Sequence, residues 1–319
     1  MSQVPALILT AGLGTRLRPL TYVRAKAAVP VNGEPLAQRV SRWLAAHGIV
    51  EQIFNLHHHP ATVAAVLGDG AALGVRIRYS WEPVVLGSAG GPRHALPLLA
   101  DGDSRYFFIV NGDTLTDVDL DAMLHSHTRT GALVTLALVS NPAPAKYGGV
   151  TVTPDGFVSG FTRAGNADES YHFVGVQVAE ARAFAALADG VPYESVMALY
   201  PELIRQSPRA VGAFVTQASF RDIGTPADYL ETSLELARDE GDVMRSPSAR
   251  IALSAVLVRS AVWDDVTVAS GARLTDCIVA DGAEIGEGLS FTRCAIVPAG
   301  SRSPARDERI EHGLLIRPL

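Results

Sequence analysis

Residues 11–31 read AGLGTRLRPLTYVRAKAAVPV and follow a short apolar run, Ala6–Leu9. The apolar run is typical of a buried parallel strand. Gly12 and Gly14 come directly after it, where the chain needs open backbone dihedrals or a close approach to a ligand. The stretch contains two glycines, four basic residues and no acid, and the first acidic residue of the whole chain is Glu34.

The basic residues of this loop indicate an anionic ligand. Backbone N–H groups exposed in such a turn form an anion-binding nest, and four cations surround it: Arg16, Arg18, Arg24 and Lys26. The predicted ligand is a polyphosphate. A tight strand-to-loop turn without a ligand is the alternative, and the basic residues together with the flanking Pro19 and Pro30 make it less favoured.

Two familiar phosphate-binding loops do not fit this stretch. A P-loop requires Gly-Lys-Ser or Gly-Lys-Thr, which does not follow Gly14. A dinucleotide fingerprint requires a third glycine or alanine, and that position holds Leu17. Of 27 basic residues, only Lys26 and Lys146 are lysines. Retention of Lys26 in an arginine-rich chain indicates a compact ammonium charge in the loop, with a solvated surface lysine as the alternative.

The loop resembles the signature of the nucleotidyltransferase family that joins a sugar 1-phosphate to a nucleoside triphosphate. The matching residues are GLGTRLRPLT at 12–21, then Lys26, then Pro30 with Val31. Ala25 departs from the pattern, since the family usually has proline there. The resemblance implies that Arg16 holds the β- and γ-phosphates that leave, and that Lys26 holds the α-phosphate.

The order of strand-like and helix-like segments predicts an α/β fold. The two types alternate from residue 6 to about 140, which indicates a Rossmann-like, mainly parallel sheet. Shorter strands follow, with a hairpin turn at Pro154-Asp155-Gly156, so the sheet is expected to be mixed. Thr225 and Pro226 mark the start of a helix. We predict a nucleotidyltransferase catalytic domain over residues 1–240.

A different period begins after a linker near residue 245. Large apolar residues recur every six residues, with one interval of five, at Val256, Val262, Val268, Leu274, Val279, Ile285, Phe291 and Val297. This spacing is typical of the hexapeptide repeat of a left-handed parallel β-helix. We predict this domain over residues 249–319, with a C-terminal tail. Because the run supplies only about two to three turns, we expect it to pack against the first domain or a partner, and we expect a homo-oligomer.

Two aspartates at predicted strand ends are candidate ligands for Mg2+. Asp113 follows an apolar run in VNGDTLTD, at the edge of the sheet where ligands bind in open α/β folds. A carboxylate that faces a polyphosphate loop suits a hard cation, and a strand-end turn or helix cap is the alternative. The resemblance implies that Asp113 is a metal ligand and that Asp222, in RDIGTP, completes the site.

The segment EPVVLGSAGG, residues 82–91, resembles the part of the family that reads the nucleobase. Its glycines let the backbone approach a flat ring, and a glycine-rich helix start without a ligand is the alternative. The sequence LGSAG is most similar to the corresponding segment of guanylyltransferases. The nucleotide-binding residues that the resemblance implies are Leu9, Ala11, Gly12, Gly14, Thr15, Gly87, Ser88 and Gly112.

For the sugar phosphate, the resemblance implies Gly148, Arg163 and Gly175. Thr162 and Arg163 stand where the family usually has glutamate and lysine, which leaves the identity of the sugar open. The run His57–His59 is not predicted to bind a metal, because consecutive side chains of a strand point to opposite faces.

The chain is most similar to the mannose-1-phosphate guanylyltransferases of the family, which implies an enzyme that makes GDP-mannose and pyrophosphate from GTP and mannose 1-phosphate. A uridylyl- or thymidylyltransferase acting on glucose 1-phosphate or another sugar 1-phosphate is the alternative. An acyltransferase is disfavoured, since residues 249–300 contain no histidine. A non-catalytic, regulatory nucleotide-sugar-binding homologue is disfavoured because the loop cations and both aspartates are present. No implied catalytic residue lies beyond Asp222, so removal of residues 245–319 is expected to change assembly more than chemistry.

Composition sets further limits. With 48% hydrophobic and 19% charged residues, the chain is typical of a folded, soluble protein. It has neither an 18-residue apolar run nor the features of a secretory signal, so we expect no membrane partner. Two cysteines give no disulfide framework and suit the cytoplasm. A net charge of −6 argues against nucleic acid as a partner.

Overall fold

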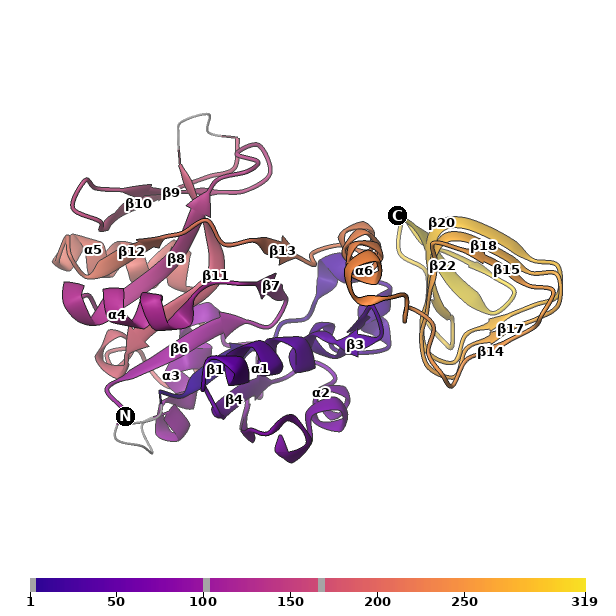
Figure 1. The fold of residues 1–319 in the computed structure, drawn as a ribbon, viewed down its shortest axis with the longest axis horizontal. Coiled ribbons are helices and arrows are strands. Elements are labelled where there is room, and N and C mark those ends of the chain that lie inside the picture. The colour runs from indigo at the N-terminus through magenta and orange to yellow at the C-terminus, as the bar shows by residue number, and fades with distance from the viewer. Residues whose placement is uncertain (1–3, 100–103, 166–169) are drawn as a thin grey trace. The chain divides into compact units, whose positions relative to one another are not determined.

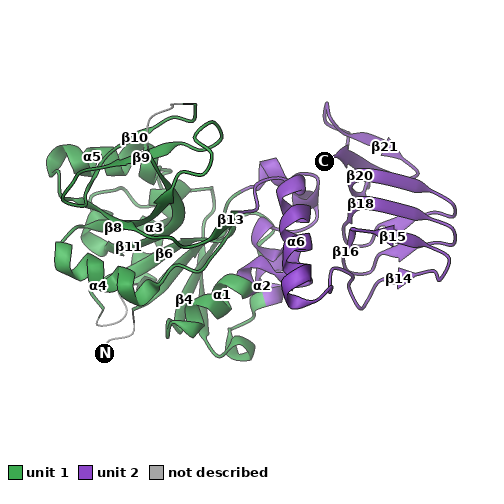
Figure 2. Ribbon diagram, turned by 45° about the horizontal axis from the view of Figure 1, so that its top comes forward, with its two compact units in different colours: residues 1–12, 39–60, 67–221 green, residues 13–38, 61–66, 222–319 purple. Residues whose placement is uncertain are grey.

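The computed structural model describes residues 4–99, 104–165 and 170–319. The chain divides into two compact units, each assembled from segments that are distant in the sequence (Figure 2). The first unit comprises residues 1–12, 39–60 and 67–221, and the second comprises residues 13–38, 61–66 and 222–319. The glycine-rich stretch therefore starts in the first unit and continues in the second.

The first unit contains a mixed α/β sheet whose centre is parallel (Figure 1). Four parallel strands lie side by side in the order β6 (Tyr106–Asn111), β1 (Ala6–Leu9), β4 (Glu51–Leu56) and β5 (Arg76–Trp81). Leu7 pairs with Ile53 on one side and with Ile109 on the other, and all three are fully buried. The apolar run Ala6–Leu9 is therefore the buried parallel strand that the sequence predicted.

Antiparallel pairing of one long strand makes the sheet mixed. β11 (Tyr171–Glu180) runs antiparallel to β6 and to β8 (Val134–Ser140), and β12 (Val211–Val215) runs parallel to β8. β9 (Gly149–Val152) and β10 (Val158–Thr162) form an antiparallel pair. The hairpin predicted at residues 154–156 is confirmed.

Helices alternate with the strands along the chain, as predicted. They are α1 (Leu36–Ala46), α2 (Pro60–Leu67), α3 (Gly87–Leu99), α4 (Leu120–Thr130) and α5 (Tyr200–Gln206). α4 begins at Asp119, whose carboxylate accepts the Ala122 N–H, and ends at Gly131 in the left-handed conformation. No helix in the described ranges has both the length and the apolar character needed to cross a membrane.

The second unit joins the loop of residues 13–38 to α6 (Pro226–Glu240) and to the C-terminal strands. α6 begins at Thr225 with a capping box, in which Thr225 and Asp228 each accept the other's backbone N–H, and Pro226 fills the first helical position. The Tyr229 hydroxyl donates to the Pro30 carbonyl at 2.6 Å, which ties α6 to the loop. The other short strands outside the C-terminal region are β2 (Pro30–Val31), β3 (Glu34–Pro35), β7 (Thr114–Thr116) and β13 (Phe220–Asp222).

Residues 245–319 form a C-terminal β domain of short parallel strands that recur every 17 residues. One sheet contains β14 (Arg250–Ile251), β17 (Thr267–Val268) and β19 (Glu284–Ile285). The other contains β15 (Val256–Val258), β16 (Ala261–Val262), β18 (Arg273–Val279), β20 (Ser290–Pro298) and the C-terminal pair β21 (Arg309–Glu311) and β22 (Leu314–Pro318). β22 runs antiparallel to β20, so the tail covers the edge of the last parallel strand.

The register of these strands corrects the predicted six-residue spacing. Paired apolar residues form three columns, namely Ile251 with Val268 and Ile285, Leu257 with Leu274 and Phe291, and Val262 with Val279 and Ile296. The intervals between columns along the chain are six, five and six residues. Two of the eight predicted positions are therefore wrong by one residue: Leu257 takes the place of Val256, which is 42% exposed, and Ile296 takes the place of Val297.

Candidate active site

The start of the glycine-rich loop is held by a side chain of the neighbouring strand. Asn55, in β4, accepts the backbone N–H groups of Thr10 and Ala11 through its Oδ1 at 2.5 and 3.2 Å. The Thr10 hydroxyl donates to the Asn55 carbonyl. Asn55 is buried, and its position at the carboxyl end of a parallel strand was the signal that sequence reasoning missed.

A buried carboxylate connects this loop start to α3. Glu82 accepts from Asn55 Nδ2 at 2.6 Å and from the Leu86 backbone N–H at 2.9 Å, and its side chain is fully buried. A Cβ on Gly91 would lie 2.8 Å from Glu82 Oε1, so this position of α3 has no room for a side chain. Glu82 therefore fixes, directly or through Asn55, both segments that the sequence assigned to the nucleotide. Sequence analysis did not single it out.

The predicted base-reading segment begins α3 in a strained turn. Gly87 has a φ of +76°, and a Cβ there would lie 2.7 Å from Glu194 Oε1 and 2.8 Å from the Tyr193 carbonyl, so glycine is required. The Ser88 hydroxyl donates to Glu194 at 2.7 Å and accepts the Ser195 backbone N–H at 2.8 Å. Residues 193–195 thus hold this helix start in place.

Gly112 and Asp113 follow β6, beside the start of the loop. The Gly112 N–H donates to the Leu9 carbonyl at 3.0 Å, and a Cβ on Gly112 would lie 2.6 Å from Thr10 Cγ2. Two residues predicted to bind nucleotide, Leu9 and Gly112, are therefore in direct contact. Asp113 is half-buried in the turn that leads to β7.

The predicted sugar-binding glycines each meet a specific neighbour. A Cβ on Gly148 would lie 2.8 Å from the Thr162 carbonyl, and one on Gly175, where φ is +81°, would lie 2.6 Å from Asn111 Nδ2. Arg163 is exposed at the end of β10. His172, absent from the prediction, forms a three-ring cluster with Tyr147 and Phe220, whose centroids are 4.4 and 4.8 Å away. Burial lowers its pKa, and a hydrogen bond with the Gly148 backbone opposes that shift.

In the second unit, the loop places its lysine against a glycine. Gly14 has a φ of +60°, and a Cβ there would lie 2.8 Å from Thr21 Cγ2 and 3.3 Å from Lys26 Cβ. The Thr21 hydroxyl donates to the Gly14 carbonyl at 2.9 Å. Position 14 therefore requires glycine, because it combines a left-handed backbone with close packing beside Lys26.

Arg16 packs against the segment that contains the second predicted metal ligand. A Cβ on Gly224 would lie 2.9 Å from Arg16 Nη1, and Gly224 follows Asp222 by two residues. Thr15 and Arg16 are exposed, whereas Lys26 and Asp222 are half-buried. The second unit thus contains both Arg16 and Lys26, and Arg16 contacts the RDIGTP segment at Gly224.

Arg24 does not serve the loop as predicted. Its guanidinium is bound by Asp281, with Nε–Oδ2 at 2.5 Å and Nη2–Oδ1 at 2.7 Å, and by Asp264 at 2.5 Å. The side chain is only 13% exposed. The interpretation of Arg24 as part of the phosphate nest is therefore wrong, because two carboxylates of the C-terminal β domain take up its charge. The Arg18 guanidinium lies over the Tyr22 ring, with its central carbon 5.4 Å from the ring centroid.

One group of three potential metal ligands occurs within the described residues: His47, Asp119 and Asp121. Asp119 is the cap of α4, and both aspartates are exposed. Within the described residues, His57–His59 do not form such a group. His57 Nδ1 lies 2.8 Å from the Glu82 carbonyl oxygen.

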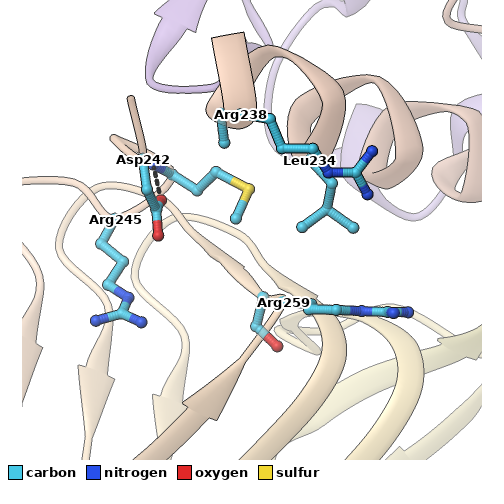
Figure 3. Close-up of a pocket in the computed structure, with 8 residues that line it drawn as sticks. Leu234, Arg238, Asp242, Arg245 and Arg259 are labelled. Atoms are coloured by element: carbon cyan, nitrogen blue, oxygen red, sulfur yellow. Dashed lines mark hydrogen bonds between the residues drawn. The ribbon is translucent and has the colours of Figure 1, made fainter. Parts of the chain in front are cut away.

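A pocket of about 250 Å3 in the second unit is lined by the end of α6 and the first turn of the C-terminal β domain. Three arginines contribute to its wall: Arg238, Arg245 and Arg259. Figure 3 shows their guanidinium groups on different sides of the pocket, without a common target. Arg259 already donates to Asp276 at 2.7 Å.

Residues 5–239 match the family model described as Nucleotidyl transferase. The chain belongs to the nucleotidyl transferase family. A mannose-1-phosphate guanylyltransferase of Mycobacterium tuberculosis is 32% identical over 296 residues, which cover 92% of this chain and 80% of that relative. An N-acetylmuramate alpha-1-phosphate uridylyltransferase of Neisseria meningitidis serogroup B is 36% identical over 201 residues, which cover 62% of this chain and 83% of the relative.

Solved structures support the fold of this nucleotidyl transferase. HddC from Yersinia pseudotuberculosis, complexed with GMP-PN, superposes with a TM-score of 0.63 at 21% identity, over 73% of this chain and 99% of that chain. The glycine-rich loop, the α3 segment and the β6 turn all lie within residues 5–239 of the family model. Residues 240–319 lie outside it.

Proposed function

We propose that this chain transfers a nucleotidyl group from GTP to mannose 1-phosphate, giving GDP-mannose and pyrophosphate. The observation that carries the proposal is the buried Asn55–Glu82 pair, which anchors both the loop start and the LGSAG helix start within one unit. A protein that must present a phosphate-binding turn and a base-binding turn to one nucleotide needs such a rigid connection. The relatives named mannose-1-phosphate guanylyltransferase support the substrate pair.

The proposed chemistry is an in-line displacement. A phosphate oxygen of the sugar 1-phosphate attacks the α-phosphorus of the nucleotide, the bond from that phosphorus to the bridging oxygen breaks, and pyrophosphate leaves. Such a transfer needs positioning and charge neutralisation rather than a covalent intermediate with the protein. We assign Lys26 to the α-phosphate and Arg16 to the leaving β- and γ-phosphates. Gly14 supports this, since it packs beside Lys26.

We assign the remaining contacts by the same reasoning. Nucleotide contacts are proposed for Leu9, Ala11, Gly12, Gly14, Thr15, Gly87, Ser88 and Gly112, and sugar-phosphate contacts for Gly148, Arg163 and Gly175. Asp113 and Asp222 are the proposed ligands of Mg2+, because carboxylate oxygens are the ligands that this hard cation prefers. When bound, Mg2+ supplies positive charge that offsets the charge of the phosphates.

We further propose that residues 1–240 act as the catalytic domain and that residues 249–319 form a left-handed β-helix. The 17-residue register and the three apolar columns support the β-helix. A homo-oligomer is proposed because the repeat supplies only about two to three turns. A cytoplasmic location without nucleic-acid or membrane partners is proposed on composition. Uridylyl transfer is the second candidate, and the 36% identity to an N-acetylmuramate alpha-1-phosphate uridylyltransferase favours it over thymidylyl transfer.

The test is a pyrophosphate-release assay with each of the five common nucleoside triphosphates against several sugar 1-phosphates. We expect release only when both substrates are present, and the highest kcat/KM with GTP and mannose 1-phosphate. A clear preference for UTP or dTTP would replace the proposed substrates and keep the reaction class. Absence of release with every pair, from a folded protein, would overturn the enzymatic proposal in favour of a regulatory nucleotide-sugar-binding role.

A further inference from the structure

We infer that the C-terminal β domain positions Lys26, and that Arg24 is the residue through which it acts. The inference rests on the proposed phosphate role of Lys26. It assigns the β domain a part in turnover, although that domain contributes no residue to the proposed substrate contacts. All the contacts involved lie inside the second unit.

The first element is the ion pair of Arg24. Asp264 and Asp281 occupy the same position on successive turns of the β domain, 17 residues apart, and the Asp264 backbone N–H donates to Asp281 Oδ1 at 3.1 Å. Two adjacent carboxylates repel each other, and the Arg24 guanidinium binds both. The Arg24 side chain is 13% exposed, that of Asp281 24% and that of Asp264 51%, so removal of Asp281 leaves the guanidinium with only its more exposed partner.

The second element ties down the other side of Lys26. The Trp263 ring lies beside Arg24, with the guanidinium carbon 5.6 Å from the ring centroid. The Trp263 indole N–H donates to the Tyr229 hydroxyl at 2.8 Å, and that hydroxyl donates to the Pro30 carbonyl at 2.6 Å. Trp263 and Tyr229 are both almost fully buried. The loop is therefore fixed two residues before Lys26 and four residues after it by one connected set of side chains.

The third element fixes the loop further upstream. Arg317, in β22, donates to the Arg18 carbonyl at 2.6 Å, and Arg302, in the tail, donates to the Tyr22 carbonyl at 3.0 Å. Arg302 also lies over the Tyr22 ring, 5.4 Å from its centroid. Three separate parts of the β domain thus contact the loop at residues 18, 22 and 24, and Trp263 supports the contact of Tyr229 with Pro30.

These contacts bear on turnover because Lys26 acts as a point charge. A displacement of about 1 Å in a positioned group can cost about 100-fold in rate. Local contacts near Lys26 include Gly14, the bond from the Ala25 N–H to the Thr62 hydroxyl at 3.0 Å and the backbone bonds of the short turn Lys26–Ala28. The contacts at Arg24 and Pro30 fix the two ends of that short segment. Arg24 is accordingly a positioning residue.

The experiment measures kcat, KM and thermal unfolding for Asp281→Ala, Arg24→Ala and the double variant. Asp276→Ala is the matched control, because Asp276 lies in the same β domain and pairs with Arg259, another residue of that domain, rather than with a residue of the loop. We expect each single variant to lose about tenfold or more in kcat and the double variant to be no worse than the poorer single one, since the two act as a unit. The control should stay within about twofold of the wild type.

The outcomes are distinguishable from failure of the proposed function. Lys26→Ala is measured in parallel, and if it keeps full activity the phosphate role itself is wrong. An inactive Lys26→Ala together with fully active Asp281→Ala would overturn only the positioning role, as would additive losses in the double variant. If the alanine variants do not fold, Asp281→Asn, which keeps the shape and one acceptor oxygen, carries the same comparison. Arg24→Lys should recover part of kcat, because it restores the charge without the bidentate geometry.

Discussion

Asn55 and Glu82 form a buried hydrogen bond of 2.6 Å between Nδ2 and Oε1. Asn55 Oδ1 accepts the Thr10 backbone N–H, and the second carboxylate oxygen of Glu82 accepts the Leu86 backbone N–H. The pair therefore couples the two turns proposed to bind the triphosphate and the base.

Replacement of Glu82 by glutamine tests this coupling. The amide keeps the shape but turns one acceptor into a donor, so either Asn55 Nδ2 or the Leu86 N–H loses its partner, at a cost of about 1–3 kcal/mol. We expect KM for GTP to rise about tenfold, with an unchanged circular dichroism spectrum. Initial-rate kinetics measure it, and Glu284→Gln, at an exposed position of the β domain, is the control. An unchanged KM in Glu82→Gln would show that the pair serves stability alone.

Gly14→Ala should separate loop strain from lysine displacement. The added Cβ would meet Thr21 Cγ2 at 2.8 Å and Lys26 Cβ at 3.3 Å, at a φ of +60°. We expect kcat to fall about tenfold or more. Gly131→Ala introduces the same backbone strain, at a φ of +66° with no atom within 4 Å, and should cost about 1 kcal/mol of stability without affecting kcat. Equal kcat in both variants would remove Gly14 from the positioning of Lys26.

His127 predicts how stability depends on pH. Burial lowers its pKa to about 4, although the Glu180 charge opposes the shift. The unfolded chain protonates this histidine near pH 6.5, whereas the folded chain does so only near pH 4. The stability that depends on a neutral His127 is therefore complete above pH 6.5 and is lost as pH falls toward 4. Between pH 7 and 5 the loss amounts to about 2 kcal/mol. Urea unfolding of His127→Asn should show a correspondingly smaller decrease, and parallel decreases in both proteins would contradict the assignment.

Asp113→Asn and Asp222→Asn test the proposed metal ligands. Each change keeps the side-chain shape and removes one charge, so the affinity for Mg2+ should fall while the fold persists. We expect most turnover to be lost, with partial recovery at high Mg2+ or with Mn2+, and a double variant little worse than either single one. Asp121→Asn serves as the control, since it belongs to the exposed group with His47 and Asp119. If Asp121→Asn alone lost turnover and recovered it at high Mg2+, the metal would be assigned to the group of His47, Asp119 and Asp121 instead.

The sequence predicted the parts of the molecule that depend on local pattern. β1, the 154–156 hairpin and the capped start of α6 follow from apolar runs, turn residues and capping residues, and each is present in the structure. The β-domain spacing was misread at Val256 and Val297 because an aliphatic residue stands beside the true core position in both places. A one-residue shift there moves a side chain from the core to the other face.

The sequence did not predict contacts between distant segments. Arg24 looks like any other cation of the loop, and only the structure shows that Asp264 and Asp281, more than 200 residues away, bind it. Asn55 and Glu82 are likewise polar residues in apolar surroundings without a motif. The expectation that residues 245–319 affect assembly more than chemistry was made without knowledge of these contacts, and the proposed role of Arg24 gives the β domain a larger part in turnover.

The most direct test of the proposed function is the turnover of Lys26→Ala with GTP and mannose 1-phosphate. Arg129→Ala, which removes an exposed cation from α4, is the control. We predict that Lys26→Ala folds normally and loses about 100-fold or more in kcat, because no other group replaces a point charge at the α-phosphate, while the control keeps wild-type kinetics. A well-folded Lys26→Ala with near-wild-type kcat would contradict the central claim that this loop carries the reaction.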